Sequence, residues 1–419
     1  MIEIFSELWA TARRNKLRTA LTGFAVAWGI FMLICLLGAG NGLINATQQN
    51  SNRFLANSMQ ISGGATSLPY DGLKEGRVIQ LNDADTKRTQ ENFTKNIETV
   101  GTQIAQYNVT ISRGENYMIA TLMGVSPNAA AINKKEILQG RFINENDIRE
   151  SRKNIVISEE QAKELLPQNP NNILGENIKL DAFAYRVVGI YKNDNSQQND
   201  IAYCAFTTVR TIYKRGDKTD NIIFSFQGLE TEAQNQDFEK EYRTQLNASH
   251  RISPDDEQAV WIWNRFTQNM QMQTGLGILN TALWVIGIFT LLSGIVGVSN
   301  IMLITVKERT REFGIRKAIG ASPMSILRLI IIESIAVTTF FGYIGMVAGM
   351  AANWYMDATI GQTKVDTGLF QASMFVNPTV GFNVCIQATI LMIVAGTIAG
   401  LIPARKAARI RPIEALKAE

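Results

Sequence analysis

Few residues in this sequence could do chemistry, and the densest group of them is the charged segment KERTREFGIRKAIGASP at residues 307–323. Within it, Glu312 and Arg316 stand at positions i and i+4 with the acid first, which is the order that better stabilises a helix. Acidic and basic side chains on one short helix suit docking onto another protein surface. A solvated loop could carry the same charges without such a role. From the residues alone, a docking helix and a solvated loop are equally favoured.

The same segment predicts a short helix with a sharp end. Gly320 can end this helix, and Ser322 can cap the helix that follows, with Pro323 in its first turn. We also expect the short helix to carry one apolar strip. The strip would consist of Phe313, Ile315, Ala318 and Ile319.

No pattern of residues indicates catalysis. The single histidine, His250, excludes a zinc site built on several histidines, and we interpret it as a surface residue. Neither a G-x-S-x-G elbow nor a G-x-x-x-x-G-K-[ST] phosphate loop is present, so P-loop binding of ATP is not expected. We therefore expect no catalytic residue, bound cofactor or metal in this chain.

Four long apolar stretches position the charged segment. They cover about residues 21–39, 276–306, 326–352 and 379–402, and each can supply the roughly 20 residues that cross a bilayer core. Charged residues make up 19% of the chain, below the roughly 25% of soluble proteins. These features favour four transmembrane helices over four buried core helices.

Lysine and arginine near the ends of the stretches predict the orientation. They gather before the first stretch, between the second and third, and after the fourth, whereas the loop between the third and fourth has only Lys364. Both termini and the charged segment are therefore expected in the cytoplasm. The net charge of +4 follows mostly from this bias, and no basic patch alternates with aromatic residues as nucleic-acid binding would need.

Polar residues inside the predicted spans are few. Glu333 is the only acidic one, and such a residue is a functional hypothesis by default. It lies near the cytoplasmic boundary, so an ion pair or a snorkelled carboxylate is favoured over a proton relay. Small residues in the later spans predict close helix packing. The glycines among them are Gly287, Gly294, Gly297, Gly342, Gly345, Gly349, Gly396 and Gly400.

Residues 45–270 predict a large domain with both helices and strands. Cys204 is the one cysteine of this segment, so no disulfide within it is expected. Strands are expected at 59–62, 154–158 and 221–226, several more at 97–125 and two at 174–193, and helices at 83–93, 159–166 and 231–248. Trp261, Trp263 and Phe266 indicate either the membrane interface or core packing.

The fold class is thus an α-helical membrane protein with four transmembrane helices plus a large mixed α/β extracytoplasmic domain inserted between helices 1 and 2. The predicted segments follow in chain order. They are a cytoplasmic amphipathic N-terminal helix (1–19), transmembrane helix 1 (20–44), the extracytoplasmic domain (45–270), transmembrane helix 2 (271–306), a short cytoplasmic helix (307–322), transmembrane helix 3 (323–353), an extracytoplasmic loop (354–378), transmembrane helix 4 (379–402) and a cytoplasmic tail (403–419).

Several motifs give a resemblance to a known family. They are RRNKLRTALT at 13–22, VKERTREFGIRKAIGAS at 306–322 and GLIPARKAARIRPIEAL at 400–416, with LGENIKLDAFAYRVVGI at 174–190 in the extracytoplasmic domain. With these motifs the chain resembles, over nearly its whole length, the MacB/FtsX family of ABC-transporter permeases of the type VII, mechanotransmission kind. Phe313 departs modestly, because the family more often has a branched aliphatic residue there.

The resemblance implies a homodimer, or a heterodimer with a related permease, in the bacterial inner membrane. A separate ATPase chain would hold the ATP and Mg, and membrane lipids would surround the spans. The 307–322 helix would be a coupling helix that lies against the ATPase. The residues that fall in it by position are Glu308, Arg309, Arg311, Glu312, Gly314, Arg316 and Lys317.

The resemblance leaves several functions open. Export or efflux of a peptide, toxin or drug, with a periplasmic adaptor and an outer-membrane channel, is the leading hypothesis. The size of the outer domain, about 225 residues, favours export and lipoprotein release over hydrolase regulation, because division-type relatives tend to have smaller outer domains. The alternatives are lipoprotein release from the inner membrane, regulation of a cell-wall hydrolase, and a membrane receptor or scaffold with no ATPase.

Overall fold

The computed structural model describes residues 16–51, 54–193, 201–360, 364–366, 371–373 and 375–409. The chain forms two compact units. The helical unit comprises Met1–Thr47, Gly275–Lys364 and Ser373–Glu419, and the sheet unit comprises Gln48–Thr274 and Val365–Ala372. Most of the predicted N-terminal amphipathic helix, up to residue 15, and the predicted cytoplasmic tail beyond residue 409 lie outside the described residues.

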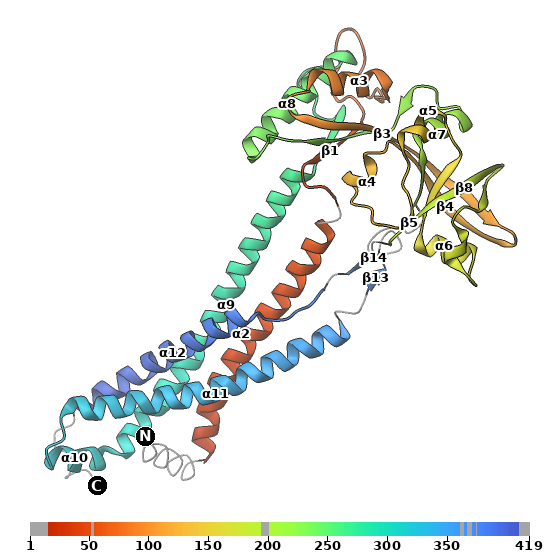
Figure 1. Ribbon diagram of the computed structural model, residues 1–419. Coiled ribbons are helices and arrows are strands. Elements are labelled where there is room, and N and C mark those ends of the chain that lie inside the picture. Colours follow the sequence, from red (N-terminus) through yellow and green to blue (C-terminus); the bar gives the residue numbers. More distant parts are fainter. Residues whose placement is uncertain are drawn as a thin grey trace. The chain divides into compact units, whose positions relative to one another are not determined.

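Four long helices dominate the helical unit (Figure 1). They are α2 (Lys16–Ser51), α9 (Arg265–Glu308), α11 (Pro323–Thr359) and α12 (Phe382–Ala408). In the part of the chain that the structure describes, these four are long and apolar enough to cross a membrane, which confirms the predicted spans. The 44 residues of α9 give a length of about 66 Å, roughly twice the thickness of a hydrocarbon core. The helix begins six residues before the predicted 271–306 span and ends two residues after it.

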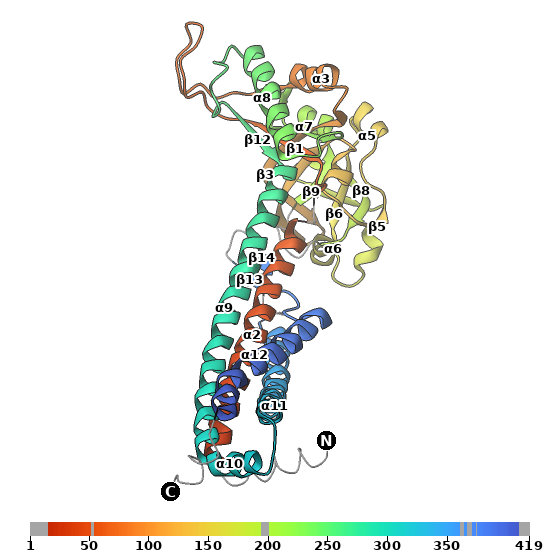
Figure 2. The same cartoon turned by 90° about the vertical axis from the view of Figure 1, so that its left-hand side faces the viewer.

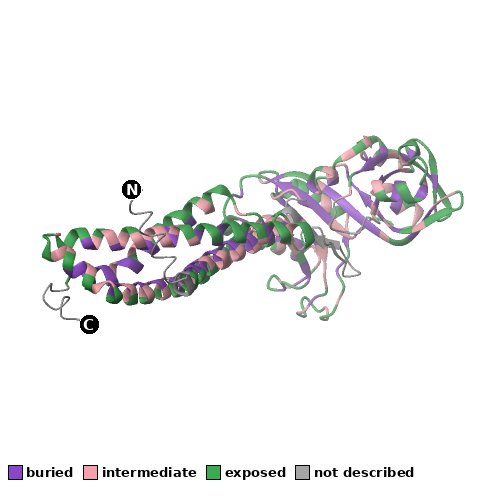
Figure 3. Ribbon diagram, turned by 90° about the horizontal axis from the view of Figure 1, so that it is seen from below, coloured by how far each residue is buried: buried purple, intermediate pink, exposed green. Residues whose placement is uncertain are grey.

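Large apolar side chains cover the outward faces of these helices. Phe289 of α9, Tyr343 and Trp354 of α11 and Ile402 of α12 are each about 60–70% exposed in the chain. In Figure 3 the long helices carry exposed residues along much of their length, whereas the strands of the sheet are largely buried. Lipid tails would cover such faces, because they are as apolar as these side chains.

Glycines let the long helices approach each other closely, as predicted. A Cβ on Gly345 of α11 would lie 2.2 Å from the carbonyl oxygen of Ala27 in α2, so only glycine fits this crossing. A Cβ on Gly396 of α12 would meet Thr338 of α11 at 2.2 Å. The Ser334 hydroxyl donates to the Gly396 carbonyl at 2.9 Å, which adds a hydrogen bond where the two helices meet.

The sheet unit is built around a ten-stranded sheet whose strand order is β12-β1-β11-β3-β4-β9-β6-β8-β5, with β7 paired to β3 and β8. The β4–β9 and β6–β8 pairs are parallel and the other pairs are antiparallel. The strands are β1 (Ser58–Gly63), β3 (Ile97–Arg113), β4 (Asn116–Val125), β5 (Ile137–Gly140), β6 (Asn154–Ser158), β7 (Asn177–Leu180), β8 (Phe183–Tyr191), β9 (Ile201–Ala205), β11 (Asn221–Phe226) and β12 (Val260–Asn264). A separate short pair joins β2 (Leu81–Asn82) to β10 (Lys218–Thr219).

Short helices cover this sheet over separate cores. Phe224, Phe238 and Tyr242 belong to one core, and Ile111, Leu122 and Val187 belong to another. The long strand β3 contributes to both cores, so it joins the two parts of the unit (Figure 1). The helices are α3 (Asp83–Asn92), α4 (Ala129–Ile132), α5 (Glu145–Arg149), α6 (Glu159–Leu165), the 3₁₀ helix η1 (Pro170–Ile173), α7 (Phe206–Ile212) and α8 (Glu232–Ser249).

Local sequence signals placed most of these elements correctly. Asn82 caps α3 through a reciprocal pair of hydrogen bonds with Asp85, as the predicted helix start required. The predicted strands at 59–62, 154–158 and 221–226 are β1, β6 and β11, and the two strands within 174–193 are β7 and β8. The hairpin of β13 (Lys364–Asp366) and β14 (Gln371–Ser373), in the predicted 354–378 loop, was not predicted.

The interpretation of His250 as a surface residue was wrong, and for Trp261 and Trp263 one of the two alternatives is excluded. The His250 side chain is only 16% exposed, and its Nε2 lies 2.9 Å from the buried Asp85 carboxylate. Core packing does not hold for Trp261 and Trp263, which are 65% and 58% exposed on the edge strand β12. Phe266, by contrast, packs against the core that contains Phe224. Alternation along β12 turns the two tryptophans outward, because successive side chains of a strand point to opposite faces.

Arg265 fastens the start of α9 to the sheet unit. Its guanidinium lies over the Phe54 ring, 3.8 Å from the centroid, and donates to the Ser58 hydroxyl at 3.3 Å. It also lies 3.5 Å from the Ile132 carbonyl, which accepts from the Leu55 amide at 2.8 Å. The residues just after α2 and the first residue of α9 are thus joined to each other and to α4.

Asp256 holds a loop of the sheet unit in place. This fully buried carboxylate accepts hydrogen bonds from the Ser67 amide at 2.7 Å and the Leu68 amide at 3.0 Å, and the amides of Gln258 and Ala259 also donate to it. Burial alone would raise the pKa of Asp256, but hydrogen bonds from Ser67, Leu68 and Gln258 hold it below its usual range. A carboxyl with a depressed folded pKa stabilises the fold above its unfolded pKa of about 3.9, and this contribution is lost as the pH falls further through the folded value.

Replacing Asp256 by asparagine should destabilise the sheet unit by about 3 kcal/mol, because an amide keeps one acceptor oxygen and turns an N–H donor toward backbone N–H groups. Thermal unfolding of the purified full-length chain in detergent measures the loss. Asp255→Asn, at an exposed neighbouring position, is the matched control and should leave the midpoint nearly unchanged. Equal midpoints for the two variants would contradict this role of Asp256.

Candidate coupling site

The charged segment folds into the short helix α10 (Thr310–Ala318), between the end of α9 and the start of α11 (Figure 2). Gly320 has a φ of +106°, and the Gly320 and Ala321 amides donate to the carbonyls of Lys317 and Arg316. This is the hydrogen-bond pattern of a helix that ends at a left-handed glycine. Ser322 then caps α11, as predicted, with Pro323 in its first turn.

A single aromatic side chain anchors α10 to the long helices. Phe313 is 1% exposed and belongs to a core cluster with Val306 of α9, Ile326 of α11 and Ala404 of α12. Gly314 beside it is also buried, which places the backbone of α10 close against the bundle. Val26 of α2 also belongs to this cluster, so the short helix cannot move far without disturbing all four long helices.

The predicted apolar strip is wrong, because Phe313 points away from its other three members. Only Phe313 of the four is buried. Ile315 is 43% exposed, Ile319 is 82% exposed, and Ala318 is also exposed. Ala318 and Ile319 lie three and four positions after Ile315 and share its exposed face, whereas Phe313, two positions before Ile315, lies on the opposite side of the helix. The exposed apolar side chains therefore belong to the outer surface of α10 and its turn.

A chain of four charges links α10 to α11. Arg309 lies 2.9 Å from Glu312 and 3.3 Å from Glu333, and Arg316 lies 2.8 Å from the other oxygen of Glu312. The Arg309 guanidinium also approaches the Phe313 ring, 5.7 Å from the centroid. The Arg309 side chain is 19% exposed and that of Glu333 is 12% exposed, so their pairing is screened less than a surface pair would be.

The structure thus places Glu333 in an ion pair, which was one of the interpretations of its sequence position. Its partner Arg309 lies 24 residues earlier, so helical spacing could not reveal it. The links from Glu312 to Arg309 and Arg316, by contrast, follow from i,i+3 and i,i+4 spacing. Lys317 was among the predicted residues, but sequence reasoning missed its contact: the ammonium donates to the Ala408 carbonyl at 2.6 Å and joins α10 to the end of α12.

The remaining predicted site residues face outward. Arg311 and Glu308 are exposed, and Arg311 stands with the exposed Ile315 on the side of α10 opposite Phe313 and Gly314. The predicted residues therefore divide into those that hold α10 in place and those that another surface could reach. Within the described residues, no three His, Cys, Asp or Glu side chains gather where they could hold a metal ion.

Comparison with known proteins identifies the class of molecule that carries this site. The family model of the MacB-like periplasmic core domain matches residues 19–242, and that of the FtsX-like permease C-terminal matches residues 284–412. Together with the four spans and the inserted α/β domain, these matches define a permease of the ABC-transporter class. The chain belongs to the MacB/FtsX family, since the first match alone covers more than half of it.

Individual relatives agree with this assignment. The chain is 26% identical over 410 residues to the macrolide export ATP-binding/permease protein MacB of Chlorobium luteolum, and the match covers 97% of this chain and 58% of that protein. It is also 26% identical over 415 residues to the ABC transporter permease YknZ of Bacillus subtilis, with coverage of 97% and 96%. The chain therefore spans about three-fifths of the length of MacB relatives but nearly all of YknZ.

Solved structures of similar name cover parts of the chain. The periplasmic region of MacB from Actinobacillus actinomycetemcomitans is 18% identical, with a TM-score of 0.43 over 54% of this chain and 96% of that one. The extracellular domain of YknZ is also 18% identical, with a TM-score of 0.41 over 50% of this chain and 100% of that one.

The charge chain predicts an asymmetry between two substitutions. Arg309→Met removes the ion pairs to both Glu312 and Glu333 and should cost about 2 kcal/mol, whereas Glu333→Gln leaves the Arg309–Glu312 pair in place and should cost about 1 kcal/mol. Thermal unfolding of the full-length chain in detergent measures both. Arg328→Met, at an exposed position of α11, is the control and should cost little. A larger loss for Glu333→Gln than for Arg309→Met would refute this account of the network.

Proposed function

We propose that ATP binding and hydrolysis by a separate ATPase chain move α10, and that the spans of this permease transmit this movement through the membrane to the sheet unit. The movement would serve the export of a peptide, toxin or drug. The observation that carries the proposal is the construction of α10. Phe313, Arg309 and Lys317 fix the helix to the long helices, while Arg311 and Ile315 face outward. A partner that pulls on the outward face would move the helices to which the inner face is fixed.

The path outward from α10 is continuous. The helix α9 runs without interruption from Glu308 to Arg265, and Arg265 is joined to Phe54 and Ser58 in the sheet unit. No charged residue occurs between Arg265 and Lys307. A stiff apolar rod that ends in a fixed joint suits transmission of movement, and it does not suit a polar conduit for substrate. Movement of this kind requires that ATP bind two states of the complex with different affinity.

A separate ATPase and a second permease copy belong to the proposal. The 419 residues contain no phosphate-loop motif, and YknZ, which this chain matches over 96% of its length, is named as a permease. ATP and Mg would be held by the ATPase chain. Export is favoured because the MacB relatives are named for macrolide export. A periplasmic adaptor and an outer-membrane channel would complete the route in a cell with two membranes.

Charge reversal on the outward face of α10 should weaken binding of the ATPase. Arg311→Glu should lower both the association of the co-expressed ATPase subunit and its permease-stimulated hydrolysis about tenfold, because it removes a cation from the contact surface. Lys95→Glu, which makes the same change at an exposed site in the sheet unit, should alter neither. Equal association of the ATPase with the two variants would defeat the docking role. Glu312 is a poorer target because it already pairs with Arg309 and Arg316.

The proposed orientation has its own test. The three native cysteines would be replaced, and single cysteines introduced at Lys95 and Arg311 would be exposed to a membrane-impermeant maleimide. In spheroplasts the cysteine at position 95 should react, whereas the one at position 311 should react only after the membrane is permeabilised. The reverse pattern would place the sheet unit in the cytoplasm and overturn the proposed direction of movement.

A further inference from the structure

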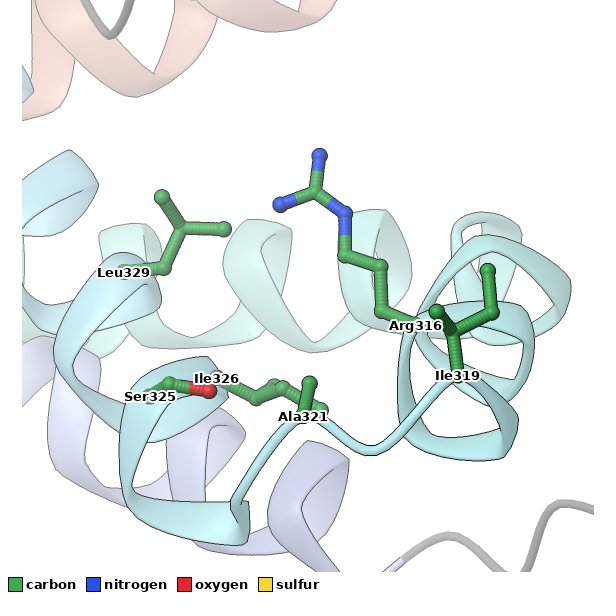
Figure 4. A pocket seen from close by; sticks show the side chains of 6 residues that line it. All are labelled: Arg316, Ile319, Ala321, Ser325, Ile326 and Leu329. Carbon is green, nitrogen blue, oxygen red and sulfur yellow. The ribbon is translucent and has the colours of Figure 1, made fainter.

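A groove lies between the end of α10 and the first turns of α11. Its volume is about 330 Å³, and its walls are formed by Arg316, Ile319, Ala321, Ser325, Ile326 and Leu329. Figure 4 shows Arg316 and Leu329 projecting in the same direction from the two helices, with Ala321, Ser325 and Ile326 beneath them. The groove is open to a partner, since Ile319 at its edge is 82% exposed.

The groove has an apolar lining and a basic edge. Ile326 is only 2% exposed and forms part of the floor, while Ile319 and Leu329 flank the opening. Arg316 stands at the edge with Glu312 on one side of it. Six basic and two acidic residues occur between positions 307 and 328, so the surroundings carry a net charge of +4. An apolar side chain with an acidic neighbour would match both features of the groove.

Lipid is a poorer match for this groove than protein. Two cations lie at the groove, Arg316 on its edge and the exposed Arg328 next to the lining residue Leu329. An acyl tail in the groove would offer no partner to either of them, whereas an acidic side chain would. A protein surface that already touches Arg311 and Ile315 on the outward face of α10 could reach the groove from the cytoplasmic side.

We propose that the ATPase subunit inserts an apolar side chain, flanked by an acidic residue that pairs with Arg316, into the groove between α10 and α11. The inference rests on the proposed function, because it names a second contact for the same partner. With it, the ATPase holds α10 from two sides and also contacts α11 directly. When an ATPase subunit moves toward or away from the second ATPase subunit, its movement would then be passed to α11, the third span, as well as to α9, the second.

An environment-sensitive fluorophore on a single cysteine tests this insertion. In the cysteine-replaced chain, a bimane on Ser325→Cys should become at least threefold less accessible to iodide when the ATPase subunit is added in detergent. A bimane on Arg328→Cys, one turn further along α11 and outside the groove, should change little. Unchanged accessibility at position 325 with the ATPase bound would overturn the proposal. So would equal protection from anionic lipid vesicles without any ATPase, because lipid would then fill the groove.

A groove-filling variant gives an independent readout. Ala321→Phe should weaken the ATPase–permease complex about tenfold, or about 1.4 kcal/mol, by occupying the space that the partner's side chain needs. The thermal midpoint of this variant should match that of the unchanged chain. If Ala321→Phe unfolds, Ser325→Leu serves in its place, because it fills the same space from α11. If Arg311→Glu weakens the complex and the filling variants do not, the groove is not a contact, although the docking of α10 stands. If Arg311→Glu also has no effect, the proposed function itself fails.

Discussion

The absence of water inside a bilayer is the constraint on which the rest of this structure depends. Without water, each backbone N–H and C=O group in a span must bond within its own helix, so the spans form without breaks. This requirement accounts for the part of α9 that crosses the bilayer core, and the helix continues unbroken beyond it, over 44 residues from Arg265 to Glu308. An uninterrupted helix is also stiff along its axis. The chemistry that allows the chain to cross a membrane therefore gives it rods that can carry movement.

Rods transmit movement only if their ends are fixed, and the two ends of α9 are fixed by different means. At Arg265 a guanidinium packs on Phe54 and donates to Ser58. At the other end, Phe313 is buried among the long helices, and Arg309 pairs with Glu312 and Glu333. Apolar burial supplies most of the attachment there, since partly exposed ion pairs contribute little each. The charges add contacts between the start of α10 and α11.

A division of labour follows along α10. Its inner residues contact other parts of the chain, and its remaining exposed surface is small and consists of basic and apolar side chains. Arg311, Ile315 and Ile319 are exposed, and the groove beside Arg316 lies next to them. The segment that looked like one charged run in the sequence is thus two surfaces, one that attaches and one that is presented. The same arrangement explains why Glu312 sits between two arginines of its own chain.

The sequence alone determined the four spans, the inserted α/β domain and the end of α10 at Gly320. These features depend on the length of apolar runs and on residues within a few positions of each other. Several strands and caps, such as Asn82 before α3, were predictable for the same reason. Only the tertiary structure decided that Phe313 points inward while Ile319 does not, that Glu333 meets Arg309, and that a groove opens beside Arg316. These features arise where segments distant in the chain come together, and the spacing of neighbouring residues does not predict which distant surfaces will meet.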